Sequence, residues 1–275
     1  MAIQLSVNLN KIALIRNSRP GNNPDLLEYA ARCINAGAGG ITVHPRPDQR
    51  HIRAADCPAL GALIAEKKHD HPTLEYNIEG NPAAAAETSD SQHSDADNHL
   101  GSYPGFMEIL RRSRPDQATL VPDADGQLTS DHGFDLRHYN AAQRQQLATT
   151  IAEIQQIGCR VSLFIDPDCE QISHARDLGA DRIELYTGPY AESVASQDSA
   201  EDSTLFEQHC AAAEHAERIG LGVNAGHDLN LHNLPQYRQL PHLREVSIGH
   251  SLTIDSLEYG LVDTLQRYRR LLDKD

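Results

Sequence analysis

The sequence predicts a single domain in which eight parallel strands alternate with helices and close into a barrel. Four helix-like stretches each reach a glycine and run straight into a short apolar strand, at 34–44, 154–166, 176–186 and 217–227. A glycine that ends a helix in the left-handed conformation is a common joint before the strand of a repeating β/α unit. The apolar strand candidates centre on Val7, Val43, Tyr76, Val121, Phe164, Leu185, Val223 and Val246. The length of 275 residues also suits one such barrel, which typically takes about 250 residues.

A closed sheet is favoured over an open one, so the predicted fold is a (β/α)8, or TIM, barrel over residues 1–275. An open sheet of this class usually has fewer strands and a glycine-rich dinucleotide turn, whereas the sequence holds no GxGxxG. After the last strand, apolar residues at three- and four-residue spacing predict one final helix that packs outside the barrel. They are Ile254, Leu257, Leu261, Leu265, Tyr268 and Leu272.

Composition restricts the partners and the compartment. The formal net charge of −15 argues against a nucleic-acid surface, although a small anion could still bind locally. No apolar run approaches the roughly 20 residues that span a bilayer, and the first residues lack the basic flank of a signal peptide. Five cysteines without CxxC spacing indicate free thiols. We therefore expect a cytoplasmic protein that binds neither nucleic acid nor membrane.

One segment, about 81–103, departs from the alternation. It has small polar residues throughout and no Lys or Arg, so it cannot bury enough apolar area to order itself. We expect a solvated, mobile insertion after the third strand. It could be a surface loop without a role, a lid or an oligomer contact.

Ligands bind this class of fold where strands end, so His44, Asp166, Tyr186 and His227 occupy positions where chemistry is expected. The first strand is followed by Asn8, Asn10, Lys11, Arg16 and Arg19. Guanidinium groups match phosphate oxygens two at a time, which suggests an anion clamp. The alternative is a solvated basic turn in an acidic protein.

The second strand ends in the sequence ITVHPRPDQRHIR (41–53), the segment richest in site-like residues. His44 can exchange protons near neutral pH, and Arg46 and His51 follow it closely enough to hold a phosphorylated substrate against it. The alternative is a histidine at the barrel rim whose ring only forms hydrogen bonds with the backbone. The nearby arginine and second histidine favour function.

Glu75 lies between Leu74 and Tyr76 in the third predicted strand. An uncompensated buried carboxylate costs several kcal/mol, so such a residue is either paired or functional. We expect Glu75 to point into the barrel mouth, where desolvation would make it a better proton acceptor. The alternative is a salt bridge to an arginine such as Arg46.

The last three strands carry further candidates. Strand six contains Glu184 and Tyr186, and strand seven ends with Asn224, Gly226 and His227. After strand eight, the sequence Gly249-His250-Ser251 precedes the final helix. Backbone N–H groups at such a helix start often form a phosphate site in these barrels. Two anion sites are therefore expected, one here and one near Arg19.

Seven segments in order carry a resemblance to a known family. They are VNLNKIALIRNSR, GITVHPRPDQRHI, LVPD, VSLFIDPD, GADRIELYTGPYA, LGVNAGHDL and SIGHSL. Together they resemble the pyridoxine 5′-phosphate synthases over nearly the whole chain apart from 81–103. The resemblance implies a TIM barrel that condenses 1-deoxy-D-xylulose 5-phosphate with 3-amino-2-oxopropyl phosphate, releasing phosphate and water. It also implies a homo-octamer with no metal and no organic cofactor.

The resemblance also assigns roles to residues. It places the two proton acceptors on His44 and Glu75 and the proton donor on His227. The residues that match positions holding the deoxyxylulose phosphate are Arg46, His51 and Thr129, the last within GQLTSDHGFD (126–135), which resembles the family's lid over the active site. Those that match positions holding the aminoketone phosphate are Asn8, Arg19, Gly249 and His250.

Three positions depart from the family pattern and face the substrates. Asn10-Lys11 stands where many members have Asp-His, and Asp228 stands where many have glycine. The added charge of Asp228 could weaken substrate binding or act on His227.

Two other functions remain open at this point. One is a phosphate-metabolite binder that no longer catalyses. The other is a metal-dependent hydrolase with ligands among His44, His51, His227 and His250, which the neighbouring arginines disfavour.

Overall fold

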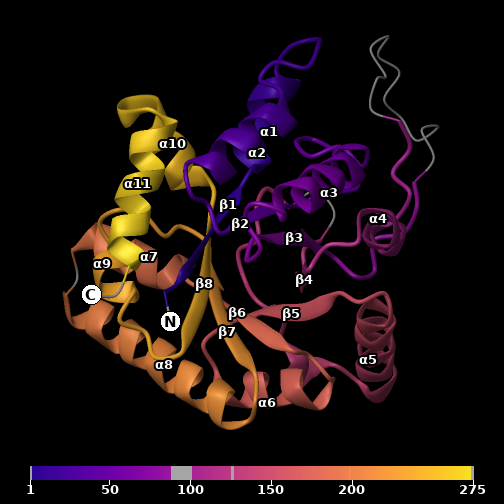
Figure 1. Ribbon diagram of the computed structural model, residues 1–275. Helices are drawn as coiled ribbons and strands as arrows, with labels where there is room; N and C mark the ends of the chain where they lie inside the picture. The colour runs from indigo at the N-terminus through magenta and orange to yellow at the C-terminus, as the bar shows by residue number, and fades with distance from the viewer. Residues whose placement is uncertain (1, 88–100, 125–126, 198, 274–275) are drawn as a thin grey trace.

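The computed structural model describes residues 2–87, 101–124, 127–197 and 199–273, and it shows a closed barrel surrounded by helices (Figure 1). The strands are β1 (Gln4–Asn8), β2 (Gly40–Val43), β3 (Glu75–Gly80), β4 (Gln117–Leu120), β5 (Arg160–Ile165), β6 (Arg182–Tyr186), β7 (Gly222–Gly226) and β8 (Leu243–Ile248). The helices are α1 (Asn10–Asn17), α2 (Leu26–Asn35), α3 (Asp56–Lys67), α4 (Phe106–Ser113), η1 (Leu136–His138), α5 (Ala141–Gln156), α6 (Cys169–Asp177), α7 (Gly188–Ser196), α8 (Ser199–Arg218), α9 (Leu234–Tyr237), α10 (His250–Tyr259) and α11 (Leu261–Leu272).

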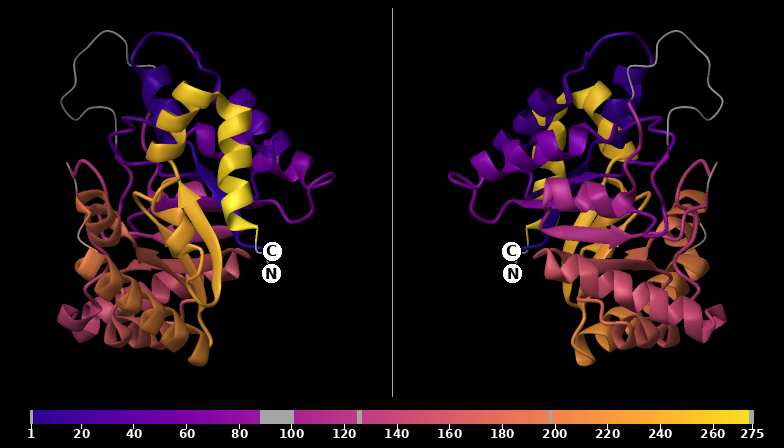
Figure 2. Two further views of the ribbon diagram at one scale, coloured as in Figure 1. Left: turned by 90° about the vertical axis from the view of Figure 1, so that its left-hand side faces the viewer. Right: turned by 90° about the vertical axis from the view of Figure 1, so that its right-hand side faces the viewer.

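The strands follow one another around the barrel in sequence order, and the predicted (β/α)8 fold is confirmed. Each strand pairs in parallel with the next, and β8 closes the ring by pairing with β1. The helices lie outside the strands in both side views (Figure 2). All four predicted helix-ending glycines have positive φ, between 84° and 99°, and they are Gly37, Gly158, Gly179 and Gly220. Of the predicted strand centres, Val121 lies one residue beyond the end of β4.

Side chains alternate along the strands, with apolar residues facing the helices and polar residues inside the barrel. One polar layer crosses the interior as a chain of hydrogen bonds. Ser6 Oγ lies 2.7 Å from Thr42 Oγ1, and Asn77 donates to Thr42 at 3.4 Å. The hydroxyl of Thr119 then donates to Asn77 at 3.1 Å and lies 3.3 Å from Glu184. Because buried polar groups need partners, these side chains satisfy one another in place of the branched apolar layers common in such barrels.

The final helix differs from the prediction, because Gly260 breaks it into α10 and α11. Gly260 has φ 80° and ψ 150°, which is far from helical geometry. The predicted stripe is therefore split. Leu261, Leu265, Tyr268 and Leu272 of α11 are buried, whereas Ile254 is 51% and Leu257 81% exposed on α10.

The predicted insertion is described only at its two ends. Glu87 forms an antiparallel bridge with Tyr103, and Tyr103 is only 2% exposed. Tyr103 is therefore buried in the core, whereas Glu87 is exposed. Residues 88–100, to which most of the prediction refers, lie outside the described residues.

Two expectations from composition, on the cysteines and on membrane spans, can be compared directly with the structure. All five cysteines fall within the described ranges, and each is a free thiol. In the part of the chain that the structure describes, no helix is long and apolar enough to cross a membrane.

Candidate active site

A cavity of about 380 Å³ opens at the carboxyl ends of the strands. Its lining includes eleven of the thirteen predicted site residues: Asn8, Asn10, Lys11, His44, Arg46, His51, Thr129, His227, Asp228, Gly249 and His250. Such a rim is where catalytic side chains of this fold gather, because every βα loop begins there. The other two predicted residues, Arg19 and Glu75, lie elsewhere.

The imidazole of His44 lies beside the carboxylate of Glu79. The pairing of β2 with β3 matches Gly40 with Glu75 and Val43 with Ile78, so the next residues, His44 and Glu79, lie level with each other. His44 Nδ1 is 3.9 Å from Glu79 Oε2, and Asn8 donates to the same oxygen at 3.3 Å. Asn10 accepts a hydrogen bond from the backbone N–H of His44 at 2.9 Å. An imidazole and a carboxylate thus face one space that a reacting molecule could occupy.

Burial shifts the protonation of these groups toward their neutral forms. It raises the pKa of Glu79 to about 7, with a further contribution from the Asp123 carboxylate. Burial also raises the pKa of Glu184, which lines the same cavity. For His44, burial and then the positive charge of Arg46 hold the pKa well below its usual range. Near neutral pH, His44 is therefore an uncharged base, and Glu79 can both accept and release a proton.

We expect the buried carboxyl groups to make stability depend on pH. Glu245 lies in the amino-terminal half of β8. Burial raises its pKa to about 7, against 4.5 for an exposed carboxyl group. The folded state holds this proton more tightly than the unfolded chain. The stabilisation is therefore complete below about pH 4.5 and is lost as the pH rises through about 7. The free energy of unfolding of the wild type should fall by up to about 3 kcal/mol between about pH 5 and pH 8 for this reason. Glu245→Gln should abolish that fall.

Thermal unfolding of the wild type and Glu245→Gln across that pH range measures this effect, because other titrating groups cancel in the difference between them. A difference in Tm that stays constant with pH would contradict the prediction.

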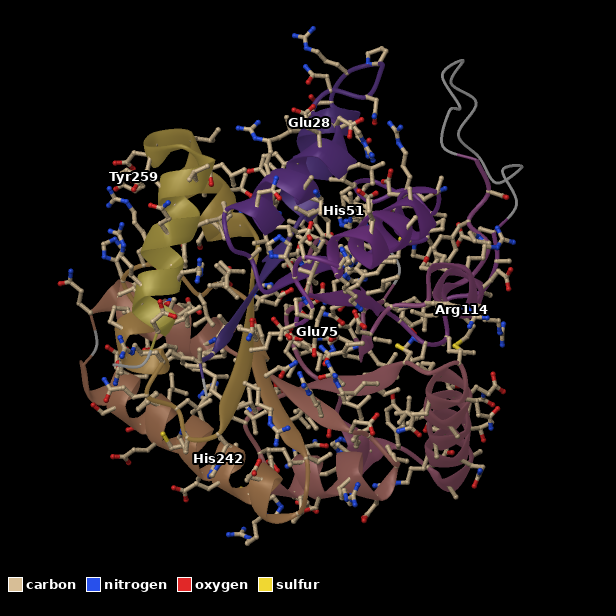
Figure 3. The ribbon with its side chains drawn as sticks, viewed as in Figure 1. Glu28, His51, Glu75, Arg114, His242 and Tyr259 are labelled. Carbon is tan, nitrogen blue, oxygen red and sulfur yellow. The ribbon has the colours of Figure 1, made fainter. Side chains whose placement is uncertain are left out.

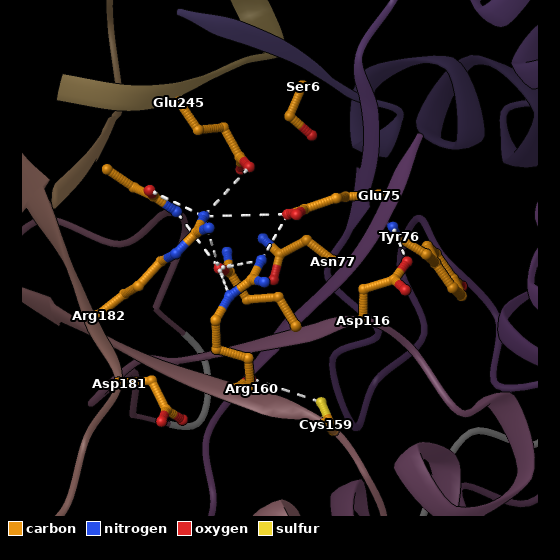
Figure 4. A network of polar contacts seen from close by, with 12 residues as sticks. Ser6, Glu75, Tyr76, Asn77, Asp116, Cys159, Arg160, Asp181, Arg182 and Glu245 are labelled. Atoms are coloured by element: carbon orange, nitrogen blue, oxygen red, sulfur yellow. Dashed lines mark hydrogen bonds and ion pairs between the residues drawn. The ribbon is translucent and has the colours of Figure 1, made fainter. Parts of the chain in front are cut away.

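Glu75 is not at the barrel mouth, so that prediction is wrong. It is the first residue of β3, and its carboxylate forms an ion pair with Arg160, the first residue of β5. Arg182 Nη1 lies 3.9 Å from Glu75 and also 3.9 Å from Glu245 (Figure 4). These residues form a charge network at the amino-terminal end of the barrel. The structure agrees with the alternative prediction, in which Glu75 forms a salt bridge. Its partners are Arg160 and Arg182 rather than Arg46.

Glu75 and Glu79 are four residues apart on the same face of β3, which separates them by about 13 Å along the strand. Figure 3 shows Glu75 well apart from His51, which lines the cavity. A sequence signal for the position of Glu79 at the cavity exists, because it directly precedes Gly80-Asn81-Pro82, where the strand must end. Glu184 of strand six also lines the cavity, although it is not among the predicted site residues.

The predicted anion clamp after β1 does not form as a unit. Arg16 is 1% exposed and makes two hydrogen bonds with Asp56, at 2.8 and 2.9 Å. Arg19 is exposed beyond the end of α1 and does not line the cavity. Of the three cations expected in the clamp, Lys11 alone lines the cavity.

Arg46 is held by a buried ion pair with Asp123, which follows β4. Asp123 also accepts a hydrogen bond from Ser130 at 2.8 Å, and Arg46 donates to the carbonyl of Gln127 at 2.9 Å. Arg46 thereby ties the strand end to the loop that carries Thr129. His44 and Arg46 also line a second cavity of about 620 Å³, bordered by Tyr103.

The four strand-end residues divide into two kinds. His44 and His227 line the cavity. Asp166 instead accepts the backbone N–H of Gly133 at 3.2 Å, which supports the loop bearing Thr129. The ring of Tyr186 lies 5.4 Å from that of His227, nearly at right angles to it. Asp166 and Tyr186 therefore contact residues next to the cavity without lining it themselves.

The glycines at the ends of β7 and β8, Gly226 and Gly249, make room for neighbouring side chains. A Cβ on Gly226 would collide with the Glu184 carboxylate. A Cβ on Gly249 would lie 3.0 Å from that of Asn8. Gly249 caps α10 and His250 is its first residue, so the unpaired N–H groups of this helix start lie beside the cavity. In the part of the chain that the structure describes, no three His, Cys, Asp or Glu residues group as metal ligands.

Comparison with known proteins decides the family. The family model described as "Pyridoxal phosphate biosynthesis protein PdxJ" matches residues 5–274. This chain belongs to the PdxJ family. A relative from Xanthomonas oryzae pv. oryzae, named pyridoxine 5′-phosphate synthase, is 50% identical over 273 residues, which cover 99% of this chain and 97% of the relative. One of the same name from Xylella fastidiosa is 47% identical over 271 residues, covering 98% and 95%.

Solved structures similar to this PdxJ family member support the fold alone. A tryptophan synthase structure from Mycobacterium tuberculosis has a TM-score of 0.59 at 10% identity, covering all of this chain and 94% of that one. KGPDC from Streptococcus mutans has a TM-score of 0.52 at 10% identity, covering 99% of both chains. Because one barrel hosts many chemistries, these two likenesses carry no functional argument.

Proposed function

We propose that this PdxJ family member is an enzyme of the transferase class with pyridoxine 5′-phosphate synthase activity. It would condense 1-deoxy-D-xylulose 5-phosphate with 3-amino-2-oxopropyl phosphate, releasing phosphate and water. Relatives with this name match it along 99% of its length. The observation that carries the proposal is that an uncharged His44 and Glu79, whose pKa burial raises to about 7, face one cavity together with His227.

The reaction requires several proton transfers around one forming ring. The amine attacks the ketone, water leaves, phosphate is eliminated, and an aldol-type closure completes the ring. We assign proton acceptance to His44 and Glu79 and proton donation to His227, so that Glu79 takes the role expected for Glu75. Burial raises the pKa of Glu184 well above its usual range, which favours the protonated form, and a protonated carboxyl group can donate a hydrogen bond to a developing oxyanion.

The polar groups around the cavity suit two phosphorylated substrates. Arg46, His51 and Thr129 are assigned to the sugar phosphate, beside Asn10 and Lys11. Asn8, Gly249 and His250, at the start of α10, are assigned to the aminoketone phosphate. Arg19 lies outside the cavity, so its assignment requires either movement of its loop or contact from a second copy. Binding two substrates side by side supplies much of the rate by effective concentration.

A turnover assay with both substrates, following pyridoxine phosphate by absorbance, tests the proposal. We expect product only when both substrates are present. Well-folded protein that binds the sugar phosphate but forms no product would overturn the proposal and favour a binder that no longer catalyses.

We expect Asp123→Asn to shift the pH dependence of the reaction. The charge of Asp123 helps to raise the pKa of Glu79 to about 7. Removing that charge favours the ionised form of Glu79, so the acidic limb of kcat/KM should move to lower pH by up to about one unit. An acidic limb that stays in place in the variant would show that Glu79 does not control it.

We also propose a cytoplasmic homo-oligomer, an octamer by family resemblance. Five free thiols suit a reducing compartment. An exposed apolar patch on α1 and α10, which pack against each other, supports self-association; it consists of Leu14, Ile15, Ile254 and Leu257. The molar mass in solution tests this, and Leu257→Asp should lower it. A wild-type mass equal to one chain would overturn the assembly.

A further inference from the structure

We propose that Asp228 is a positioning residue that orients the ring of His227 for proton transfer. The inference rests on the proposed function, because it concerns the group assigned as proton donor. It gives Asp228 a task other than contact with substrate.

The ring of His227 is held at both of its nitrogen atoms. Its Nδ1 lies 2.7 Å from Asp228 Oδ2, and its Nε2 lies 3.0 Å from Thr129 Oγ1. The hydrogen bond from His227 holds the pKa of Asp228 below its usual range, so the carboxylate is ionised near neutral pH. An ionised carboxylate can only accept, and therefore Nδ1 carries the proton.

This arrangement determines which nitrogen takes part in proton transfer. With the Nδ1 proton engaged by Asp228, the Nε2 atom is left to exchange a proton with its neighbours. In the neutral ring Nε2 accepts from the Thr129 hydroxyl, and in the protonated ring Nε2–H is the group that can be donated. A carboxylate that orients an imidazole in this way recurs in enzymes that use histidine as acid or base.

The backbone presents both side chains in an uncommon conformation. His227 has φ 86° and Asp228 has φ 57°, and both values lie in the left-handed region. Non-glycine residues seldom adopt it, although aspartate tolerates it better than most. The hydroxyl of Thr187 donates to the carbonyl groups of Gly226 and His227. These hydrogen bonds hold the backbone of the turn in place. The turn therefore places the Asp228 carboxylate against the ring of the residue before it.

Two variants separate orientation from folding. Asp228→Gly removes the carboxylate and suits the left-handed backbone, so it should fold at least as stably as the wild type. Asp228→Asn keeps the shape and an oxygen acceptor but removes the charge. We expect Asp228→Gly to lower kcat by about 10-fold or more, and Asp228→Asn by less, with KM for each substrate within about 2-fold of the wild type.

Arg114→Gly is the matched control for the backbone. Arg114 also has positive φ, 45°, at the end of α4, and it does not line the cavity; Figure 3 shows it well apart from His51, which does. Its replacement makes the same kind of backbone change and should leave kcat and KM unaltered.

Nitrogen NMR of His227 in substrate-free protein gives a readout that does not depend on turnover. We expect the proton on Nδ1 in the wild type and a shift toward the Nε2–H form in Asp228→Gly. An unchanged tautomer in Asp228→Gly would overturn the proposal, as would a raised KM with unchanged kcat. If the wild type forms no product, the proposed function fails, while the tautomer still tests the role of Asp228.

Discussion

Glu79→Gln should lower kcat by about 100-fold to 10,000-fold, which is the usual contribution of a positioned acid or base. Glutamine keeps the size of the side chain and can still accept from Asn8, but it cannot take up a proton. Glu79 lies 3.9 Å from His44, and burial places its pKa at about 7. Steady-state kinetics with both substrates measures the effect, and binding of the sugar phosphate should change little.

Glu75→Gln is the matched control, because it makes the same chemical change on the same face of β3. Glu75 pairs with Arg160 at the other end of the barrel, so the variant should lose stability while its kcat stays within about 3-fold of the wild type. The assignment of Glu79 fails if Glu75→Gln abolishes turnover and Glu79→Gln does not.

Arg16→Met should destabilise the protein by about 3–5 kcal/mol, since it leaves the carboxylate of Asp56 without its buried partner. The side chain of Asp56 is 16% exposed, so water solvates it only in part. Arg16 also donates to the carbonyl of His51 at 2.9 Å. The loop that carries His51 into the cavity should therefore loosen as well. Chemical denaturation gives the free energy, and KM for the sugar phosphate reports on the loop.

The double variant Arg16→Met/Asp56→Asn tests the cause of this loss. Removing both charges should recover part of the stability, because no uncompensated carboxylate remains. If the two single losses simply add in the double variant, the ion pair is not what stabilises this region.

Local signals in the sequence were enough to determine the architecture. The glycine joints predict a repeating β/α unit because a left-handed residue is needed where each helix turns back to its strand. Polar residues directly after apolar strands predict the rim of the cavity. His44 and His227 were found in this way, because each directly follows the last residue of its strand.

Which of several similar residues reaches the cavity depends on contacts between segments that are far apart in the sequence. In β3 the side chains alternate with a period of two, so Glu75, Asn77 and Glu79 share one face and only the pairing with β2 sets their height in the barrel. Arg16 and Arg19 are near neighbours in sequence, yet Arg16 is buried and Arg19 is exposed. The difference is that Arg16 pairs with Asp56, which is forty residues away. The fold and the rim can be predicted from the sequence, because periodicity and turn chemistry are local. Register and long-range ion pairing are not local, and they selected Glu79, Asp123 and Glu184 from among similar residues.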